Sequence, residues 1–457
     1  MKKLLIISCA AIALVSGLSG CKPNAESKAN SEASVSAEKP RDEWVLKDFI
    51  DEAGSDYVML GLQFKPYDKN YVDAFTGDPA LLEQAEAEPR PLAEIISRTA
   101  GLRTRIDRFE NFESFNDDAD LVARHKLLRA DVNALNIRAR MMNGETFTFD
   151  EETRELYDAV APQYSEADFA AARAKNDAAN KTKDKSGEPP TRIIPQDKVR
   201  AVMSKAIEEC RTRTLAHYDL PETESFDLEF VTDKPWSAYN WYKGDYRSLI
   251  EVNQDIPLTI ERALDLGCHE GYPGHHVYNV RAEKFRKRQK GWPEAQLVPL
   301  YSPSSPLMEG SANYGLELAF PGLEKKRYDA EVLYPLAGLT PPSNITEADP
   351  DLADARRVLA NVGIHVAREY LDGRMSRDEA IAFYMKYGGR SQKRAEQGLD
   401  FIDTYRGYII NYTLGQDVVR DWVAMRVEAG EEPWEAFKYL LDTPVTVGQL
   451  QDDLKGK

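Results

Sequence analysis

The chain has 457 residues and a formal net charge of −17, with 42% hydrophobic and 30% charged residues. This composition is that of a soluble globular protein, long enough for one large domain or two fused lobes. Such an acidic chain lacks the basic surface that nucleic acids require, so no nucleic-acid partner is expected. Broad adhesion to anionic lipids is also disfavoured, and any membrane contact should come from a discrete anchor.

An anchor of this kind is predicted at the N-terminus. A basic start, MKK, precedes a short apolar stretch from Leu4 to Gly17, which has the layout of a signal peptide and is too short for a comfortable membrane span. The following LSGC resembles a bacterial lipobox, although an ordinary signal peptide with an incidental cysteine is the alternative. The resemblance implies removal of residues 1–20 and lipidation of Cys21. Because Lys22 follows, not Asp, we expect an outer-membrane location facing the periplasm.

Residues 21–43 are expected to form a tether. They are mostly Ser, Ala, Glu and Lys with almost no apolar side chains, so they cannot build a core. About 20 extended residues span at most about 70 Å. The globular body can therefore stand clear of the lipid surface.

The region 44–195 is predicted to be helical. Apolar residues recur at threes and fours in Leu82–Ala100 and Ala119–Met142, and Pro89 and Pro91 interrupt the first of these patterns. The polar stretch 174–196 contains a Pro-Pro pair. We expect it to be a surface excursion before the second region, 196–457.

The second region is predicted to combine helices with a few strands. Ala201–His217 has a helical pattern, whereas Phe226–Val231 and Tyr246–Val252 carry β-favouring residues between polar turns. Further helices are predicted over Leu352–Leu371 and Ser376–Tyr387, the latter opening with a Ser and a Glu at capping-box spacing. The expected fold is mainly α with a small β-sheet.

Two cysteines, Cys210 and Cys268, remain after Cys9 is removed and Cys21 is lipidated. An oxidising periplasm permits a disulfide between them. Two thiols in so long a chain are more often buried and free, and we expect them to be free. The chain has no Cys-x-x-Cys pair, so no thiolate metal site is predicted.

The histidines point to a metal site. Only six occur, and three fall within HEGYPGHH, from His269 to His276. Imidazole and carboxylate groups are ligands that Zn²⁺ selects. Zincins place two histidines at i and i+4 on one helix, with Glu at i+1 as general base. Here Glu270 occupies the position of the base, but the second histidine is at i+6 or i+7.

This spacing predicts a deformed helix. On a regular helix, position i+7 lies about 10.5 Å further along the axis, and i+6 is on roughly the opposite side. Neither suits two ligands of one ion with bonds of about 2 Å. The Tyr272-Pro273-Gly274 stretch can break the helix, because Pro lacks a donor and Gly tolerates unusual dihedrals. A two-residue bulge favours His275 as second ligand, with His276 as the alternative.

HEGYPGHH resembles the signature of a bacterial family known as domain of unknown function 885, which has zincin-like His-Glu and Pro-Gly-His-His segments. Three further stretches are similar: EGSANY from Glu309, with Ser where Trp is usual, GIH ending at His365, and YTLGQ from Tyr412. The family's Pro-Gly-Gln-Ala is replaced here by RGYI, in which only the glycine matches. The resemblance covers roughly residues 200–457 and implies a mainly helical, gluzincin-like fold.

The resemblance also implies roles for individual side chains. Glu309 is the expected third zinc ligand, and Glu270 is expected to take a proton from the attacking water. His365 and Tyr412 are candidates to stabilise the oxyanion. The resemblance places the strand ending at Val252-Asn253 at a sheet edge, where it can pair with an extended peptide, and an internal strand without ligand contact is the alternative.

Together these patterns predict a lipid-anchored, zinc-dependent hydrolase of the bacterial envelope, with peptides as the expected substrates. The alternative is a catalytically inactive lipoprotein with a zincin-like fold that serves as a binding or scaffold module. Glu270 argues against this alternative, because a site that only binds zinc needs no base.

Overall fold

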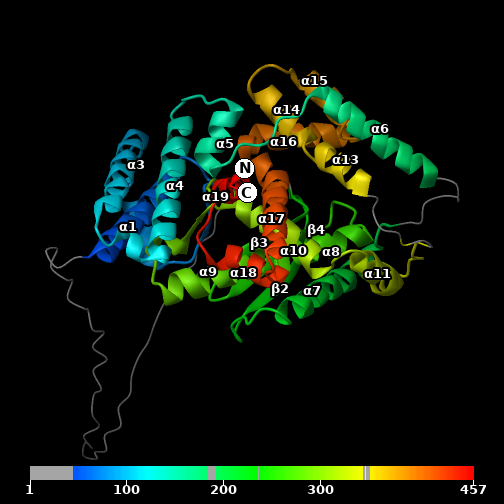
Figure 1. The fold of residues 1–457 in the computed structure, drawn as a ribbon, viewed down its shortest axis with the longest axis horizontal. Helices are drawn as coiled ribbons and strands as arrows, with labels where there is room; N and C mark the ends of the chain where they lie inside the picture. Colours follow the sequence, from blue (N-terminus) through cyan, green and yellow to red (C-terminus); the bar gives the residue numbers. More distant parts are fainter. Residues whose placement is uncertain (1–44, 184–191, 235, 343–344, 346–349, 457) are drawn as a thin grey trace, which may run out of the picture. The chain divides into compact units, whose positions relative to one another are not determined.

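A computed structural model of the protein describes residues 45–183, 192–234, 236–342, 345 and 350–456 (Figure 1). The predicted signal peptide, Cys21 and the tether lie outside these residues. In the described part of the chain, none of the helices combines the length and apolar character needed to cross a membrane. Contacts from Val45 onward belong to one compact unit, and the predicted border at residues 195 and 196 stays a prediction.

The first helices match the predicted pattern closely. They are α1 (Leu46–Phe64), α2 (Pro79–Ala87), α3 (Leu92–Asp107), α4 (Ala119–Met142) and α5 (Phe149–Tyr157). Helices α1, α3 and α4 lie side by side (Figure 1).

Local sequence explains where these helices begin and end. As predicted, Pro89 and Pro91 interrupt the helical pattern between α2 and α3. Helix α4 has the predicted bounds. Asp118 is the N-cap of α4, and its carboxylate accepts hydrogen bonds from the backbone N–H groups of Asp120 and Leu121.

Helix α6 (Glu166–Lys183) extends into the stretch that was expected to be a surface excursion. Its sequence is rich in Ala, the strongest helix former, and the helix packs beside α13 (Pro350–Ala360; Figure 1). Residues 174–183 are therefore part of a helix and not of the expected surface excursion.

Four of the short 3₁₀ helices are η2 (Arg108–Asn111), η3 (Phe115–Asp117), η4 (Gln196–Lys198) and η7 (Pro293–Gln296). The other helices of the described residues lie mainly in the second half of the chain. They are α7 (Val199–Leu215), α8 (Ile260–Leu266), η5 (Gly267–Gly271), α9 (His275–Ala282), η6 (Glu283–Gln289), α10 (Ser305–Ala319), α11 (Glu324–Tyr328), η8 (Asp329–Leu333), α12 (Tyr334–Leu336), α14 (Val362–Leu371), α15 (Arg377–Lys386), α16 (Gln392–Tyr405), η9 (Arg406–Ile409), α17 (Ile410–Glu428), α18 (Pro433–Asp442) and α19 (Val447–Lys455). The predicted capping box forms at the start of α15, where the Ser376 backbone N–H donates to the Glu379 carboxylate at 2.8 Å. The expected mainly α fold is confirmed.

Three strands form a sheet in the order β2-β4-β3. Strand β4 (Arg247–Asn253) runs parallel to β2 (Ser225–Val231) and antiparallel to β3 (Ala238–Gly244). The sequence predicted β2 and β4 but missed β3, whose Asn, Lys and Gly residues disfavour strands. The expected edge position of the strand ending at Val252-Asn253 is wrong, because β4 pairs on both sides. A second, two-stranded sheet joins β1 (Val72–Phe75) to β5 (Leu297–Pro299).

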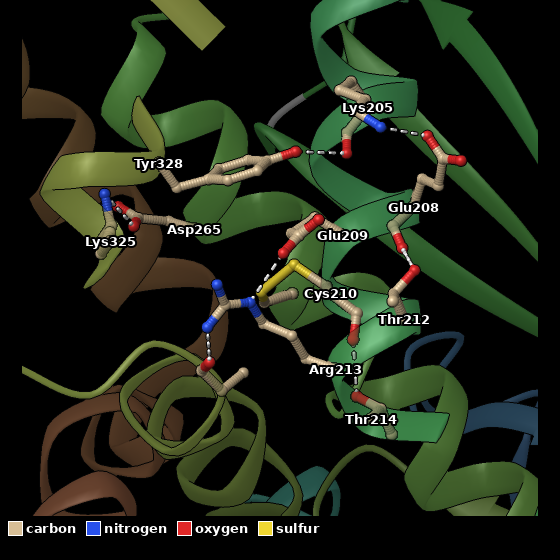
Figure 2. The surroundings of a disulfide bond; sticks show 12 residues. Lys205, Glu208, Glu209, Cys210, Thr212, Arg213, Thr214, Asp265, Lys325 and Tyr328 are labelled. Carbon is tan, nitrogen blue, oxygen red and sulfur yellow. Dashed lines mark hydrogen bonds and ion pairs between the residues drawn. A yellow bond between two sulfur atoms is a disulfide. The ribbon is translucent and has the colours of Figure 1, made fainter. Parts of the chain in front are cut away.

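Cys210 and Cys268 form a disulfide, so the expectation of free thiols is wrong. Helix α7 packs directly on η5, and a Cβ on Gly267 would lie 3.2 Å from the backbone nitrogen of Ile207. This close approach brings the two buried cysteines together, with their Cα atoms 5.4 Å apart. Figure 2 shows the bond beside the ion pair of Arg213 with Glu209. The bond fixes the turn that contains His269 to α7.

We expect the Cys210→Ala/Cys268→Ala double variant to lose about 2–4 kcal/mol of unfolding free energy, because the unfolded chain is no longer cross-linked. Urea unfolding, followed by circular dichroism, measures this loss. Reduced wild-type protein is the matched control and should unfold at the same lower urea concentration. Equal midpoints for the variant and the oxidised wild type would show that the cross-link does not form.

Candidate metal centre

The histidine-rich segment leaves the regular helix as its sequence predicts. Helix α8 continues into the π-helix η5, the chain then breaks at Tyr272-Pro273-Gly274, and α9 begins at His275. The backbone N–H of Gly274 donates to the Cys268 carbonyl at 3.1 Å. A Cβ on Gly274 would lie 1.9 Å from the His269 carbonyl oxygen, so only glycine fits this approach.

The break brings His269 and His275 together, with their Nε2 atoms 3.1 Å apart. Oε2 of Glu309, near the start of α10, lies 3.4 Å from Nε2 of His269 and 3.7 Å from Nε2 of His275. The Glu270 carboxylate belongs to the same group, and its ligand atom lies within 4.8 Å of those of both histidines. The structure thus joins four of the side chains that the sequence analysis selected.

The three converging atoms fit a tetrahedral zinc ion. Ligands with bonds of about 2.0–2.1 Å stand about 3.3 Å apart around such an ion, close to the separations seen here. In addition, Oε2 of Glu309 is buried and has no hydrogen-bond partner among the described residues. A buried carboxylate oxygen without a partner is costly, and a bound cation removes that cost.

The electrostatics of the cluster also favour a cation. Burial alone would lower the pKa of His275, but the carboxylates of Glu309, Glu270 and Asp73 raise this pKa to about 9. Burial would raise the pKa of Glu309, yet His269 and His275 hold it well below its usual range. The carboxylate of Glu309 is therefore ionised, and its charge is balanced by a proton on the imidazole of His275. A divalent cation can take the place of that proton.

The second carboxylate oxygen of Glu309, Oε1, accepts a hydrogen bond from the hydroxyl of Tyr408 at 3.0 Å. Tyr408 lies in η9, just before α17, and α10 crosses α17 at very short range. A Cβ on Gly310 would lie 2.2 Å from the backbone carbon of Gly415. The contact between Gly310 and Gly415 keeps α10 close to α17, so η9, which directly precedes α17, lies near Glu309. The sequence analysis missed Tyr408, although it stands only four positions before Tyr412.

Tyr412 is near the cluster and remains partly open to solvent, with 37% of the residue exposed. Its ring centroid lies 5.9 Å from that of Tyr408 on the preceding turn. Desolvation and the negative charges of Glu309 and Glu270 raise the pKa of Tyr412 well above its usual value. Its hydroxyl therefore keeps its proton and can donate a hydrogen bond.

His365 does not join the cluster. It packs on α14 between Phe383 and Phe169, with ring centroids 4.8 Å and 5.2 Å away. Burial lowers its pKa, and the charged groups acting on it, foremost Glu369 and Arg368, are not those of the cluster. The expected oxyanion role of His365 is not supported, because its ring packs against those of Phe169 and Phe383 and the leading charges that act on it do not belong to the cluster.

His276 is not a third imidazole of the cluster, so the alternative ligand choice is wrong. It is fully buried, and its Nε2 donates to Glu224 at 2.9 Å while its Nδ1 accepts from Ser248 at 2.8 Å. On a helix, each residue is rotated by about 100° from the one before it. One step beyond His275 therefore turns His276 into the core.

Strands from distant parts of the sequence complete the surroundings of the cluster. Asp73 of β1 accepts a hydrogen bond from the Tyr239 hydroxyl of β3. Asn240, also on β3, donates to the backbone carbonyl of Glu270 at 2.7 Å. Sequence analysis missed all three residues. No local signal connects Asp73 with a segment that is nearly 200 positions away.

Comparison with known proteins adds information on the fold. No family model and no curated protein matches the chain, so the resemblance to the family of unknown function stays a prediction. A crystal structure described as a lipoprotein from Colwellia psychrerythraea is similar, with a TM-score of 0.50 and 13% identity over 80% of this chain and 70% of that one. At this identity the similarity shows the fold alone.

Two metallopeptidase structures show weaker similarity. The M32 carboxypeptidase from Deinococcus radiodurans R1 has a TM-score of 0.45 and 14% identity, over 90% of this chain and 95% of that one. Metallocarboxypeptidase 1 of Trypanosoma cruzi has a TM-score of 0.43 and 10% identity, over 90% and 91% of the two chains.

We expect His275→Ala and His276→Ala to have opposite effects on zinc content, although the two residues are adjacent. Elemental mass spectrometry after zinc incubation should find about one zinc per wild-type chain, none in His275→Ala, and nearly the wild-type amount in His276→Ala. Circular dichroism checks that each variant is folded. Loss of zinc from a folded His276→Ala, with retention in His275→Ala, would reverse the assignment.

The network of Glu224 predicts a dependence of stability on pH. Burial would raise the pKa of Glu224, but hydrogen bonds from His276, Tyr272 and Arg211 lower it from 4.5 to about 2. Its ionised form therefore stabilises the fold above pH 4.5, and this contribution is lost as the pH falls toward 2.

The variant Glu224→Gln should accordingly be less stable than the wild type at pH 7. The difference in unfolding free energy should shrink between pH 4.5 and pH 2, the range over which the carboxylate protonates. Urea unfolding at a series of pH values measures it. Stability curves that run parallel over this range would contradict the prediction.

Proposed function

We propose that the protein is a zinc-dependent hydrolase that cleaves peptide bonds. The observation that carries this proposal is the convergence of His269, His275 and the unpartnered oxygen of Glu309 beside the carboxylate of Glu270. Two imidazoles and one carboxylate leave a fourth coordination position free for water or substrate, as in catalytic zinc sites.

His269, His275 and Glu309 would hold the zinc. When bound, Zn²⁺ polarises a substrate carbonyl and lowers the pKa of water toward neutrality. Tyr408 orients Glu309 through the hydrogen bond to Oε1. Such support fixes a ligand in place and commonly changes metal affinity when it is removed.

Glu270 is the general base of the proposed reaction. Its carboxylate lies among the ligand atoms, where it can accept a proton from the attacking water and pass it to the leaving amine. The hydrogen bond from Asn240 to its backbone carbonyl positions the residue from the side of β3. A site that served only to bind zinc would need neither feature.

Tyr412 is the proposed donor to the oxyanion. It keeps its proton, it lies close to the charges of Glu309 and Glu270, and part of it is exposed to solvent. A hydrogen bond that is offered to the developing negative charge stabilises the transition state more than the substrate.

We also propose that the protein acts in the bacterial envelope, anchored through lipid on Cys21 and facing the periplasm from the outer membrane. The lipobox-like LSGC supports the anchor. The Cys210–Cys268 disulfide supports an oxidising compartment, in which such bonds persist.

The decisive experiment compares wild type, Glu270→Gln and Tyr412→Phe as full mature chains loaded with zinc. Cleavage of a peptide library is followed by mass spectrometry, with and without chelator. We expect Glu270→Gln to lose about 10²–10⁴-fold in rate while it retains zinc, and Tyr412→Phe to lose about 10²–10³-fold in kcat.

Chelation should abolish cleavage, and added zinc should restore it. If Glu270→Gln cleaves as fast as the wild type, the proposed mechanism is wrong. If the zinc-loaded wild type cleaves no peptide, the inactive binding module replaces the hydrolase.

A further inference from the structure

The Cys210–Cys268 disulfide ends one residue before the proposed metal ligand His269. Cys210 lies on α7 (Figure 2), Cys268 lies in η5, and both cysteines are fully buried. Two adjacent residues therefore connect one short turn to two parts of the protein. The sulfur of Cys268 is bonded to α7, whereas Nε2 of His269 lies 3.1 Å from Nε2 of His275.

The backbone of Cys268 also joins the two histidine segments. Its carbonyl accepts a hydrogen bond from the backbone N–H of Gly274 at 3.1 Å. His269 directly follows Cys268, and His275 directly follows Gly274, so this bond ties the chain together just ahead of both histidines. A Cβ on Gly274 would lie only 2.4 Å from the same carbonyl oxygen. A displacement of Cys268 therefore changes the separation of the two imidazoles.

Helix α7 also contacts the helix of the third ligand. Arg213, which Figure 2 shows beside the disulfide, donates to the carbonyl of Ala319 at 2.8 Å. Ala319 is the last residue of α10, the helix that carries Glu309. Helix α7 is thus bonded covalently to the turn of His269 and by a hydrogen bond to the helix of Glu309. The disulfide consequently helps to set the 3.4 Å between Oε2 of Glu309 and Nε2 of His269.

The turn depends on such support because its backbone is irregular. Helix η5 is a π-helix, a form that is rare and mostly limited to single turns. Its other contacts are non-covalent. Asn240 donates to the Glu270 carbonyl at 2.7 Å, and a Cβ on Gly267 would lie 3.2 Å from the backbone nitrogen of Ile207. Without the cross-link, these contacts alone oppose local opening of the turn.

We propose that the Cys210–Cys268 disulfide controls metal binding, so that the site binds zinc tightly only after the two thiols have been oxidised. The inference rests on the metal site of the proposed function and adds its regulation. In the oxidation, two S–H bonds break and one S–S bond forms. The two electrons and two protons pass to the disulfide of a thiol–disulfide oxidant, which becomes two thiols.

Burial of the two cysteines determines when this control acts. Neither residue is accessible in the folded protein, so oxidants and reductants reach the sulfur atoms only when the chain opens. Oxidation therefore belongs to folding in an oxidising compartment, and the folded protein keeps the bond. A chain that folds in a reducing compartment binds zinc weakly, so its hydrolase site stays inactive there.

The test measures the zinc affinity of the full mature protein by competition with a chromophoric chelator. It compares the oxidised wild type, the wild type reduced in urea and refolded without oxygen, and Cys210→Ala. Groups that support metal ligands change metal affinity by about 10- to 100-fold when they are removed. We expect this increase in the zinc dissociation constant for the reduced wild type and for Cys210→Ala. Re-oxidation should restore tight binding only in the wild type.

Two controls separate the position of Cys268 from general stability. Cys210→Ala changes no residue of the histidine segment, and oxidised wild type taken through the same urea step controls for refolding. Leu102→Ala removes a buried side chain from α3, which packs on α1 and α4, and so destabilises the fold far from the turn. It should bind zinc like the oxidised wild type. A loss of affinity equal to that of Cys210→Ala would overturn the proposal.

Hydrogen exchange of the metal-free protein gives a second readout. In Cys210→Ala the amide of Gly274 should exchange faster than in the wild type, because the Cys268 carbonyl that accepts its hydrogen bond is no longer anchored. Amides of α3 should change much less. A uniform increase over the whole chain would show a general loss of stability and would also overturn the proposal.

The outcomes distinguish this proposal from the hydrolase function. Equal zinc affinities of the oxidised and reduced wild type overturn the control by the disulfide and leave the hydrolase standing. A redox-dependent zinc affinity in a protein that cleaves no peptide supports the control and overturns the hydrolase. Failure of the oxidised wild type to bind zinc overturns both.

Discussion

The interruption of the helix between Gly267 and His275 is the constraint on which the candidate site depends. In a regular helix, His269 and His275 would face nearly opposite directions. The π-helical turn and the close approach of Gly274 to the His269 carbonyl instead bring their Nε2 atoms to 3.1 Å. The Cys210–Cys268 disulfide holds one side of this turn, and the bond from Asn240 to Glu270 holds the other.

The adjacent residues His275 and His276 face two different buried carboxylates, those of Glu309 and Glu224. The carboxylate of Glu224 accepts bonds from His276, Tyr272 and Arg211, so this buried charge is fully compensated. Glu309 accepts a hydrogen bond from Tyr408 on one oxygen, and its other oxygen lies 3.4 Å and 3.7 Å from the Nε2 atoms of His269 and His275 without a hydrogen bond among the described residues. Burial therefore leaves one carboxylate satisfied and the other in need of a cation.

The N-terminal region also contributes a charge to the surroundings of the metal cluster. Strand β1 pairs with β5, and this pairing brings Asp73 next to the Tyr239 hydroxyl on β3. The charge of Asp73 then acts on His275 and Glu309. A site that its motifs place in residues 200–457 thus takes part of its electrostatic environment from residue 73.

Features that depend on a few neighbouring residues can be read from the sequence. The bounds of α4, the proline break before α3, the capping box of α15 and the distortion after His269 all follow from local backbone preferences. Long-range packing sets the order of the strands in the sheet and the pairing of the two cysteines. It also brings Tyr412 and Tyr408, but not His365, toward Glu309. These outcomes depend on how closely distant helices pack, as at the contact of Gly310 with Gly415, and no local pattern encodes that distance.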